Sequence, residues 1–103
     1  MELTLLAVPG CPGAAGFEVM LASVLAGRPD VVLHRREISD ELAAAAEAGM
    51  HGSPTLLING TDPFAVPARE PGLFCRLYPR AAGRPGRVPS AEALRQALAA
   101  ARD

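Results

Sequence analysis

Apolar residues along this chain fall into short continuous runs and into longer stretches with helical spacing. The short runs predict four β-strands, over residues 2–8, 31–38, 55–58 and 73–78. The first run is almost uninterrupted, which is typical of a central strand covered on both faces. The second run ends in Arg35, Arg36 and Glu37, and these charges indicate a strand at the edge of the sheet.

Three stretches have the spacing and the end signals of α-helices. The first begins near Pro12, and its apolar residues follow one face: Phe17, Met20, Leu21, Val24 and Leu25. The second, residues 40–48, follows Ser39, which is a fair N-cap. Ser90 caps the third, whose apolar residues also share one face.

The predicted elements follow one another in the order β-α-β-α-β-β-α. A right-handed βαβ crossover, a hairpin and a closing helix predict an α/β fold, with a four-stranded mixed sheet flanked by three helices on its two faces. No repeat or linker interrupts residues 1–103, which we expect to form a single domain. Of the two loops predicted, 62–72 contains three prolines and is expected to cover the functional site, while 79–89 is rich in Pro, Gly and Arg.

The composition excludes several classes of protein. Half of the residues are hydrophobic and 20% are charged, as in an ordinary soluble domain. No apolar run approaches the ~20 residues needed to cross a bilayer. No basic segment precedes the first strand, so we expect a cytoplasmic protein without a cleaved signal and without a membrane partner. The net charge of −1 gives no electrostatic footprint for nucleic acid, and the oligomeric state is left open.

All ten basic residues are arginines, and four of them cluster in one stretch: Arg76, Arg80, Arg84 and Arg87. Charged residues of this kind are mostly exposed, so a solvated basic loop is the favoured interpretation. Binding of an anionic ligand is the alternative.

The first strand-to-helix junction has the residues of a reactive thiol site. Cys11 lies between Pro9-Gly10 and Pro12-Gly13, so we expect it in a turn rather than in the core. Free N–H groups and the dipole at a helix start stabilise a thiolate and lower its pKa from about 8.5. We therefore predict that Cys11 is a nucleophile and that Pro12 and Gly13 contact its substrate. A buried, inert cysteine is the alternative.

A second candidate segment, Ser53-Pro54, leads directly into the strand predicted at 55–58. Proline at a strand start gives up no ladder hydrogen bond. We predict a cis peptide bond there, turning open backbone groups toward the thiol, and a substrate-binding role for both residues; an ordinary trans bond is the alternative. His51 is expected in a loop that approaches Cys11, as a base or proton donor. A surface histidine explains it equally well.

The other cysteine, Cys75, falls in the strand predicted beside residues 55–58. Together with Cys11 it could bind a soft metal ion such as mercury, copper(I) or zinc. The two could also form a disulfide if their Cα atoms lie within about 7 Å. Packing of Cys75 within the strand is the alternative. Thiol chemistry alone requires no cofactor.

On these residues the chain resembles a minimal thioredoxin-like domain, and more narrowly the catalytic core of organomercurial (alkylmercury) lyase and small bacterial proteins grouped with it. The resemblance is carried by Cys11 at a helix start, Cys75 within LFCRLY, and the segment PSAE before the last helix. In the lyase, two cysteines hold mercury, and an aspartate three residues after the first protonates the departing carbon. That position is Ala14 here. The resemblance thus implies two-thiolate coordination without the proton donor for carbon–mercury cleavage.

Three functions are compatible with the sequence. The first, which we favour, is a thiol–disulfide oxidoreductase in which Cys11 attacks a small-molecule or protein disulfide and Cys75 resolves the intermediate. The second is a lyase-like or soft-metal-binding protein that uses both thiols. The third is a non-catalytic module that binds a partner beneath the loop 62–72.

Overall fold

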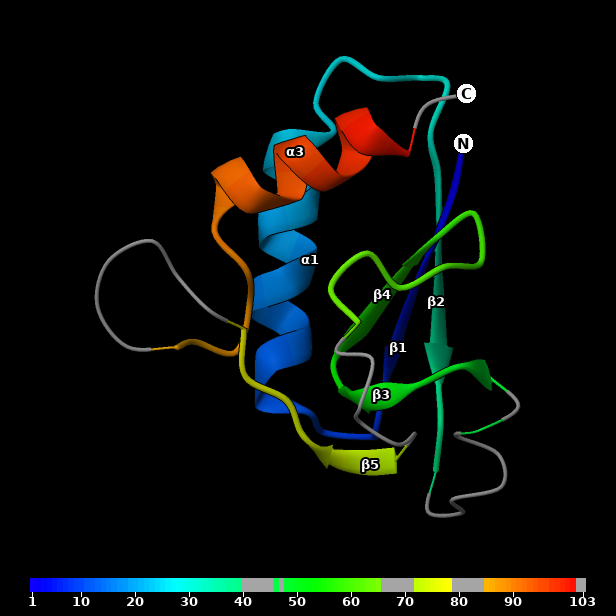
Figure 1. Ribbon diagram of the computed structural model, residues 1–103, viewed down its shortest axis with the longest axis vertical. Helices are drawn as coiled ribbons and strands as arrows, with labels where there is room; N and C mark the ends of the chain where they lie inside the picture. Colours follow the sequence, from blue (N-terminus) through cyan, green and yellow to red (C-terminus); the bar gives the residue numbers. More distant parts are fainter. Residues whose placement is uncertain (40–45, 47, 66–71, 79–84, 102–103) are drawn as a thin grey trace.

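The computed structural model describes residues 1–39, 46, 48–65, 72–78 and 85–101 (Figure 1). Within this part, the strands and helices are β1 (Glu2–Ala7), α1 (Pro12–Val24), β2 (Val32–Glu37), β3 (His51–Ser53), β4 (Thr55–Ile58), β5 (Gly72–Cys75) and α3 (Ala91–Ala100). They form a small α/β domain with a mixed sheet. Neither described helix is long and apolar enough to span a bilayer.

β1 is the middle strand of a three-stranded sheet with the order β2-β1-β4. β2 runs parallel to β1, with Val32 opposite Glu2, and β4 runs antiparallel, with Ile58 opposite Leu3. Because alternate side chains of a strand point to opposite faces, the apolar run of β1 supplies both sides of the sheet. The prediction of a central first strand is therefore confirmed.

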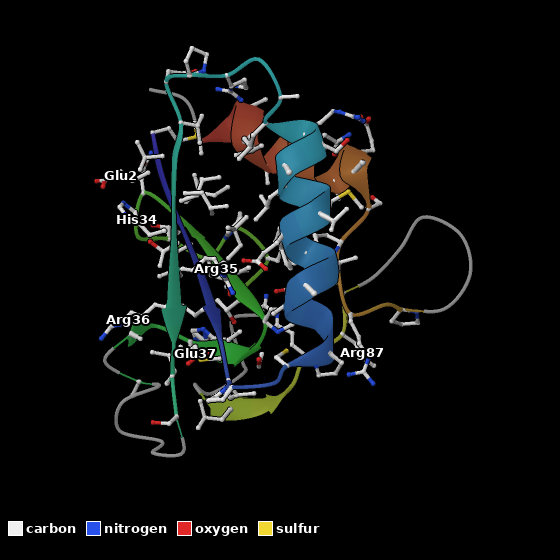
Figure 2. The ribbon with its side chains drawn as sticks, turned by 180° about the vertical axis from the view of Figure 1, so that it is seen from behind. Glu2, His34, Arg35, Arg36, Glu37 and Arg87 are labelled. Atoms are coloured by element: carbon white, nitrogen blue, oxygen red, sulfur yellow. The ribbon has the colours of Figure 1, made fainter. Side chains whose placement is uncertain are left out.

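The predicted edge position of the second strand is also confirmed, since β2 ends the strand order and all six of its residues are exposed. Figure 2 labels the charged side chains of β2. Arg35 forms an ion pair with Glu18 of α1. His34 lies 3.1 Å from a carboxylate oxygen of Glu2.

The predicted four-stranded sheet is wrong for the described residues. β5 does not join β4; it pairs in parallel with β3, with Cys75 opposite Ser53, and makes a separate two-stranded sheet. Figure 1 shows this small sheet lying across the end of β1, near the start of α1. Pro54 separates β3 from β4. Since proline has no N–H for a ladder, it interrupts the strand where the two sheets meet.

α1 and α3 pack on one face of the sheet (Figure 1). Their buried cluster includes Phe17 and Leu21 of α1 and Leu94 and Leu98 of α3, so the apolar faces predicted for both helices are confirmed. α3 begins as predicted, because the hydroxyl of Ser90 accepts a 3.1 Å hydrogen bond from the amide at the third helical position.

The opposite face of the sheet carries a smaller cluster of Leu6, Ile38 and Met50. The helix predicted over 40–48 lies outside the described residues except at 46 and 48, and most of both predicted loops lies outside them. The placement of helices on both faces therefore stays a prediction.

Candidate thiol site

Cys11 immediately precedes α1, whose first residue is Pro12. The backbone of Cys11 is extended, with φ −61° and ψ 119°. Its amide donates a 3.1 Å hydrogen bond to the carbonyl oxygen of Val8, and its carbonyl oxygen accepts one of 3.2 Å from the amide of Ala14. The thiol is free and the residue is partly exposed. The strand-to-helix position predicted for Cys11 is confirmed, and Cys11 is not a core residue.

Gly13 brings the first turn of α1 into close contact with two other parts of the chain. A Cβ atom on Gly13 would lie 3.0 Å from the Cβ of Arg87 and 3.1 Å from the Cδ of Pro54. Gly13 is accordingly buried, whereas Pro12 beside it is exposed. The absence of a side chain at Gly13 thus admits Pro54 and Arg87 to within packing distance of the turn that carries Cys11.

The Ser53–Pro54 peptide bond is cis, as predicted. The hydroxyl of Ser53 accepts a 3.0 Å hydrogen bond from the amide of Val8, which ties this bond to the end of β1. One residue earlier, the carbonyl oxygen of Gly52 accepts a 2.6 Å hydrogen bond from the hydroxyl of Thr55.

The next two carbonyl groups are also paired within the chain. The amide of Arg76 donates a 3.1 Å hydrogen bond to the carbonyl oxygen of Ser53. The hydroxyl of Tyr78 donates one of 2.5 Å to the carbonyl oxygen of Pro54. Residues 52–55 are all buried. The carbonyl groups beside Pro54, which were expected to be open, are therefore hydrogen-bonded within the chain. Substrate contact by Ser53 and Pro54 stays a prediction.

A buried ion pair lies beneath this segment. Arg76 and Asp62 approach to 2.6 Å, and their side chains are only 6% and 4% exposed. The guanidinium of Arg76 also donates to the hydroxyl of Thr55 at 3.1 Å and to the carbonyl oxygen of Phe64 at 2.7 Å. These added hydrogen bonds satisfy a charge whose burial would otherwise be strongly unfavourable.

The solvated basic loop predicted for the arginine cluster is therefore wrong for Arg76. Its guanidinium is drawn inward because Asp62 supplies a buried partner. Arg87 is exposed, and Figure 2 shows its side chain beside the N-terminal end of α1, directed outward. Arg80 and Arg84 lie outside the described residues.

Tyr78 completes the packing behind the thiol site. Its ring lies edge-on to Phe17 at 5.7 Å and to Phe64 at 5.5 Å, and the guanidinium of Arg76 lies 4.6 Å from its centre. Burial raises the pKa of Tyr78 well above its ordinary value; Arg76 opposes the shift, and nearby Asp62 and Cys11 add to it. Tyr78 is thus a neutral hydrogen-bond donor within electrostatic reach of Cys11.

The structure brings the backbone of Cys75 to the same end of the sheet. Cys75 lies opposite Ser53 in the β3–β5 pair, and Ser53 is the residue before Pro54. The side chain of Cys75 is outside the described part of the structure. Its roles as resolving thiol and metal ligand stay predictions.

His51 lies in β3, opposite Gly72, and not in the loop predicted for it. The strand forms because β5 pairs with this segment, which local sequence does not reveal. The Nδ1 atom of His51 is buried and has no hydrogen-bond partner among the described residues. Its role as a base or proton donor for Cys11 stays a prediction.

Sequence reasoning missed the three residues that hold the Pro54 segment: Asp62, Arg76 and Tyr78. One signal was available. Arg76 interrupts an otherwise apolar run, and a charge at such a position requires a buried partner. The partner lies 14 residues away, so spacing along the chain does not identify it.

No group of three or more His, Cys, Asp or Glu side chains suited to a metal occurs in the described residues. A cavity of about 460 Å³, lined in part by Asn59, Thr61 and Ala97, lies between the turn after β4 and the end of α3. Ile58, at that end of β4, pairs with the start of β1, whereas Cys11 follows the end of β1. The cavity and the thiol are thus at opposite ends of the sheet.

Comparison of the chain with protein-family models, curated proteins and solved structures found no match. The fold and the site define a small α/β domain with a free, partly exposed cysteine at the start of a helix that packs against Pro54.

Proposed function

We propose that this protein carries out thiol–disulfide exchange through Cys11. The observation that carries the proposal is the position of a free, partly exposed cysteine immediately before α1, whose first turn packs against Pro54. Unpaired amide groups at a helix start stabilise a thiolate, the form that attacks disulfides.

The exchange has two steps. The Cys11 thiolate attacks one sulfur of a disulfide; a Cys11–sulfur bond forms, the original sulfur–sulfur bond breaks, and the second sulfur leaves as a thiolate with the bonding electrons. A second thiolate, from Cys75 or from a low-molecular-weight thiol, then attacks the mixed disulfide. In the first case the products are a Cys11–Cys75 disulfide and the released thiolate; in the second, Cys11 is regenerated and a new disulfide leaves.

The arrangement of the larger sheet supports a thioredoxin-like fold as part of this proposal. The order β2-β1-β4, with β2 parallel and β4 antiparallel to β1, agrees with the βαβ crossover and the mixed sheet predicted for such a domain. The separate pairing of β5 with β3 departs from it.

The test is mass-spectrometric alkylation of the reduced protein with limiting iodoacetamide at several pH values. Cys11 is expected to react faster than the same residue in a denatured control, as cysteines at helix starts commonly do. Cys75→Ser should retain this reactivity and Cys11→Ser should abolish it. Equal rates in the native and denatured chains would overturn the proposal.

Two-thiolate binding of a soft metal ion is a second candidate. The observation that favours it is the β3–β5 register, which places the backbone of Cys75 opposite Ser53, next to Pro54. Thiolates prefer mercury(II) and copper(I), while Ala14 supplies no acid for carbon–mercury cleavage. Binding of one mercuric ion per chain, lost in both Cys11→Ser and Cys75→Ser, is the expected result. Binding that survives either substitution would contradict it.

A further inference from the structure

The backbone next to Pro54 is closed to an added polypeptide strand. β5 pairs with β3 along one edge, where the amide of Arg76 bonds to the carbonyl oxygen of Ser53. The carbonyl oxygen of Pro54 is bonded to Tyr78. Residues 52–55 are buried, with Ser53 3% exposed. A substrate peptide would have to displace β5 to pair with this segment.

The turn that carries Cys11 offers little backbone to a partner. The exposed neighbours of Cys11 along the chain are Pro9, Gly10 and Pro12. The two prolines have no N–H group, and the amide of Cys11 already donates to Val8. The amide of Gly10 and the carbonyl oxygens of Pro9 and Gly10 therefore remain as the backbone groups that this turn offers, and a strand ladder uses more donors and acceptors than these.

We infer that the disulfides that Cys11 attacks belong to low-molecular-weight compounds and not to extended polypeptides. This inference rests on the proposed thiol–disulfide exchange and narrows its substrate class. Because Pro9, Gly10 and Pro12 are exposed and Cys11 is partly exposed, a small disulfide can approach the thiol at this turn without backbone pairing. The exchange itself is the one written above: the small disulfide forms a mixed disulfide with Cys11 and releases one thiolate.

The test compares two mixed disulfides with the same leaving group, 2-nitro-5-thiobenzoate. One carries a capped single cysteine, and the other carries an extended, capped peptide with a central cysteine. Both react with reduced full-length Cys75→Ser, so that only Cys11 attacks, and both react separately with free glutathione as the reference for intrinsic reactivity. Release of the coloured thiolate gives each rate constant.

Each rate constant is divided by the rate constant of the same compound with glutathione. The corrected value for the long disulfide is expected to exceed that for the short one by no more than about threefold, because backbone pairing would increase it on the order of tenfold or more. A larger preference for the long disulfide would overturn the inference and leave the proposed function intact. The double variant Cys11→Ser/Cys75→Ser, which has no thiol, is the control. If Cys75→Ser reacts with neither compound faster than this double variant, the proposed function fails, and the inference fails with it.

Discussion

The hydroxyl of Tyr78 donates a 2.5 Å hydrogen bond to the carbonyl oxygen of Pro54, 24 residues earlier in the chain. Two residues before Tyr78, the amide of Arg76 bonds to Ser53 and its guanidinium bonds to Thr55. Residues 76 and 78 therefore hold three consecutive residues, 53–55. Gly13, in the first turn of α1, also packs closely against this segment, since a Cβ atom there would lie 3.1 Å from the Cδ of Pro54. The position of Pro54 relative to the start of α1 is set by these two groups of contacts.

Tyr78→Phe should lower the free energy of unfolding by about 1–3 kcal/mol, because the buried carbonyl of Pro54 loses its donor. The ring contacts with Phe17 and Phe64 are kept, so the fold should persist. Urea unfolding followed by circular dichroism measures the change. An unaltered free energy of unfolding would show that the hydrogen bond does not hold this segment.

Stability should fall above about pH 10, the ordinary pKa of tyrosine. Burial raises the pKa of Tyr78 in the folded state. The unfolded chain therefore loses its phenolic proton at lower pH than the folded chain. Between the two pKa values the folded state binds more protons, so the stabilisation present below pH 10 is lost as pH rises.

The composition makes this alkaline transition easy to assign, since the chain has one tyrosine and no lysine. Tyrosinate absorbance should stay low in the native protein past pH 10 and rise together with unfolding. Tyr78→Phe retains both cysteines and should lose this part of the pH dependence. A native-state phenolate that forms at the ordinary pKa would contradict the burial argument.

Asp62→Asn should destabilise the fold by about 3–5 kcal/mol, because Arg76 would keep a buried charge without its partner. The matched control is Asp30→Asn, which removes the exposed partner of Arg28 and should change stability by less than about 1 kcal/mol. Urea unfolding midpoints measure both. Equal effects of the two substitutions would mean that burial adds nothing to the Arg76–Asp62 interaction.

The sequence predicted what depends on neighbouring residues. The junction at Cys11 follows from the Pro and Gly residues around it, and the cap of α3 follows from Ser90. The buried face of α1 follows from the spacing of Phe17 and Leu21. Each of these features is decided within about one turn or one strand of chain.

The features that the sequence did not predict depend on competition between distant segments. Residues 72–75 have the apolar pattern of a strand, but the pattern does not say whether β3 or β4 is the partner. Likewise, Arg76 is buried only because Asp62 is near it in the fold. His51 becomes part of a strand for the same reason, since β5 lies alongside. Local pattern predicted the type of element at residues 72–75, whereas tertiary contacts decide its partner and, at His51, whether a strand forms at all.

Gly13→Ala and Gly16→Ala, in the same helix, should have opposite effects. A Cβ atom at Gly16 would meet Val88 at an ordinary 3.8 Å, so alanine should add about 0.8–1 kcal/mol of helix stability. At Gly13 it would lie 3.0–3.1 Å from Arg87 and Pro54. Pro54 cannot yield, because Tyr78 holds its carbonyl and the residue is buried.

Gly13→Ala should therefore destabilise the fold and displace the first turn of α1, which carries Cys11. Two measurements check this: urea unfolding of both variants, and the iodoacetamide reaction rate of Cys11 in a Cys75→Ser background. Gly16→Ala should leave that rate unchanged, whereas Gly13→Ala should alter it, because the turn that presents the thiol moves. If Gly13→Ala stabilises the chain as much as Gly16→Ala does and leaves the rate unaltered, then the close packing of α1 against Pro54 does not position the thiol.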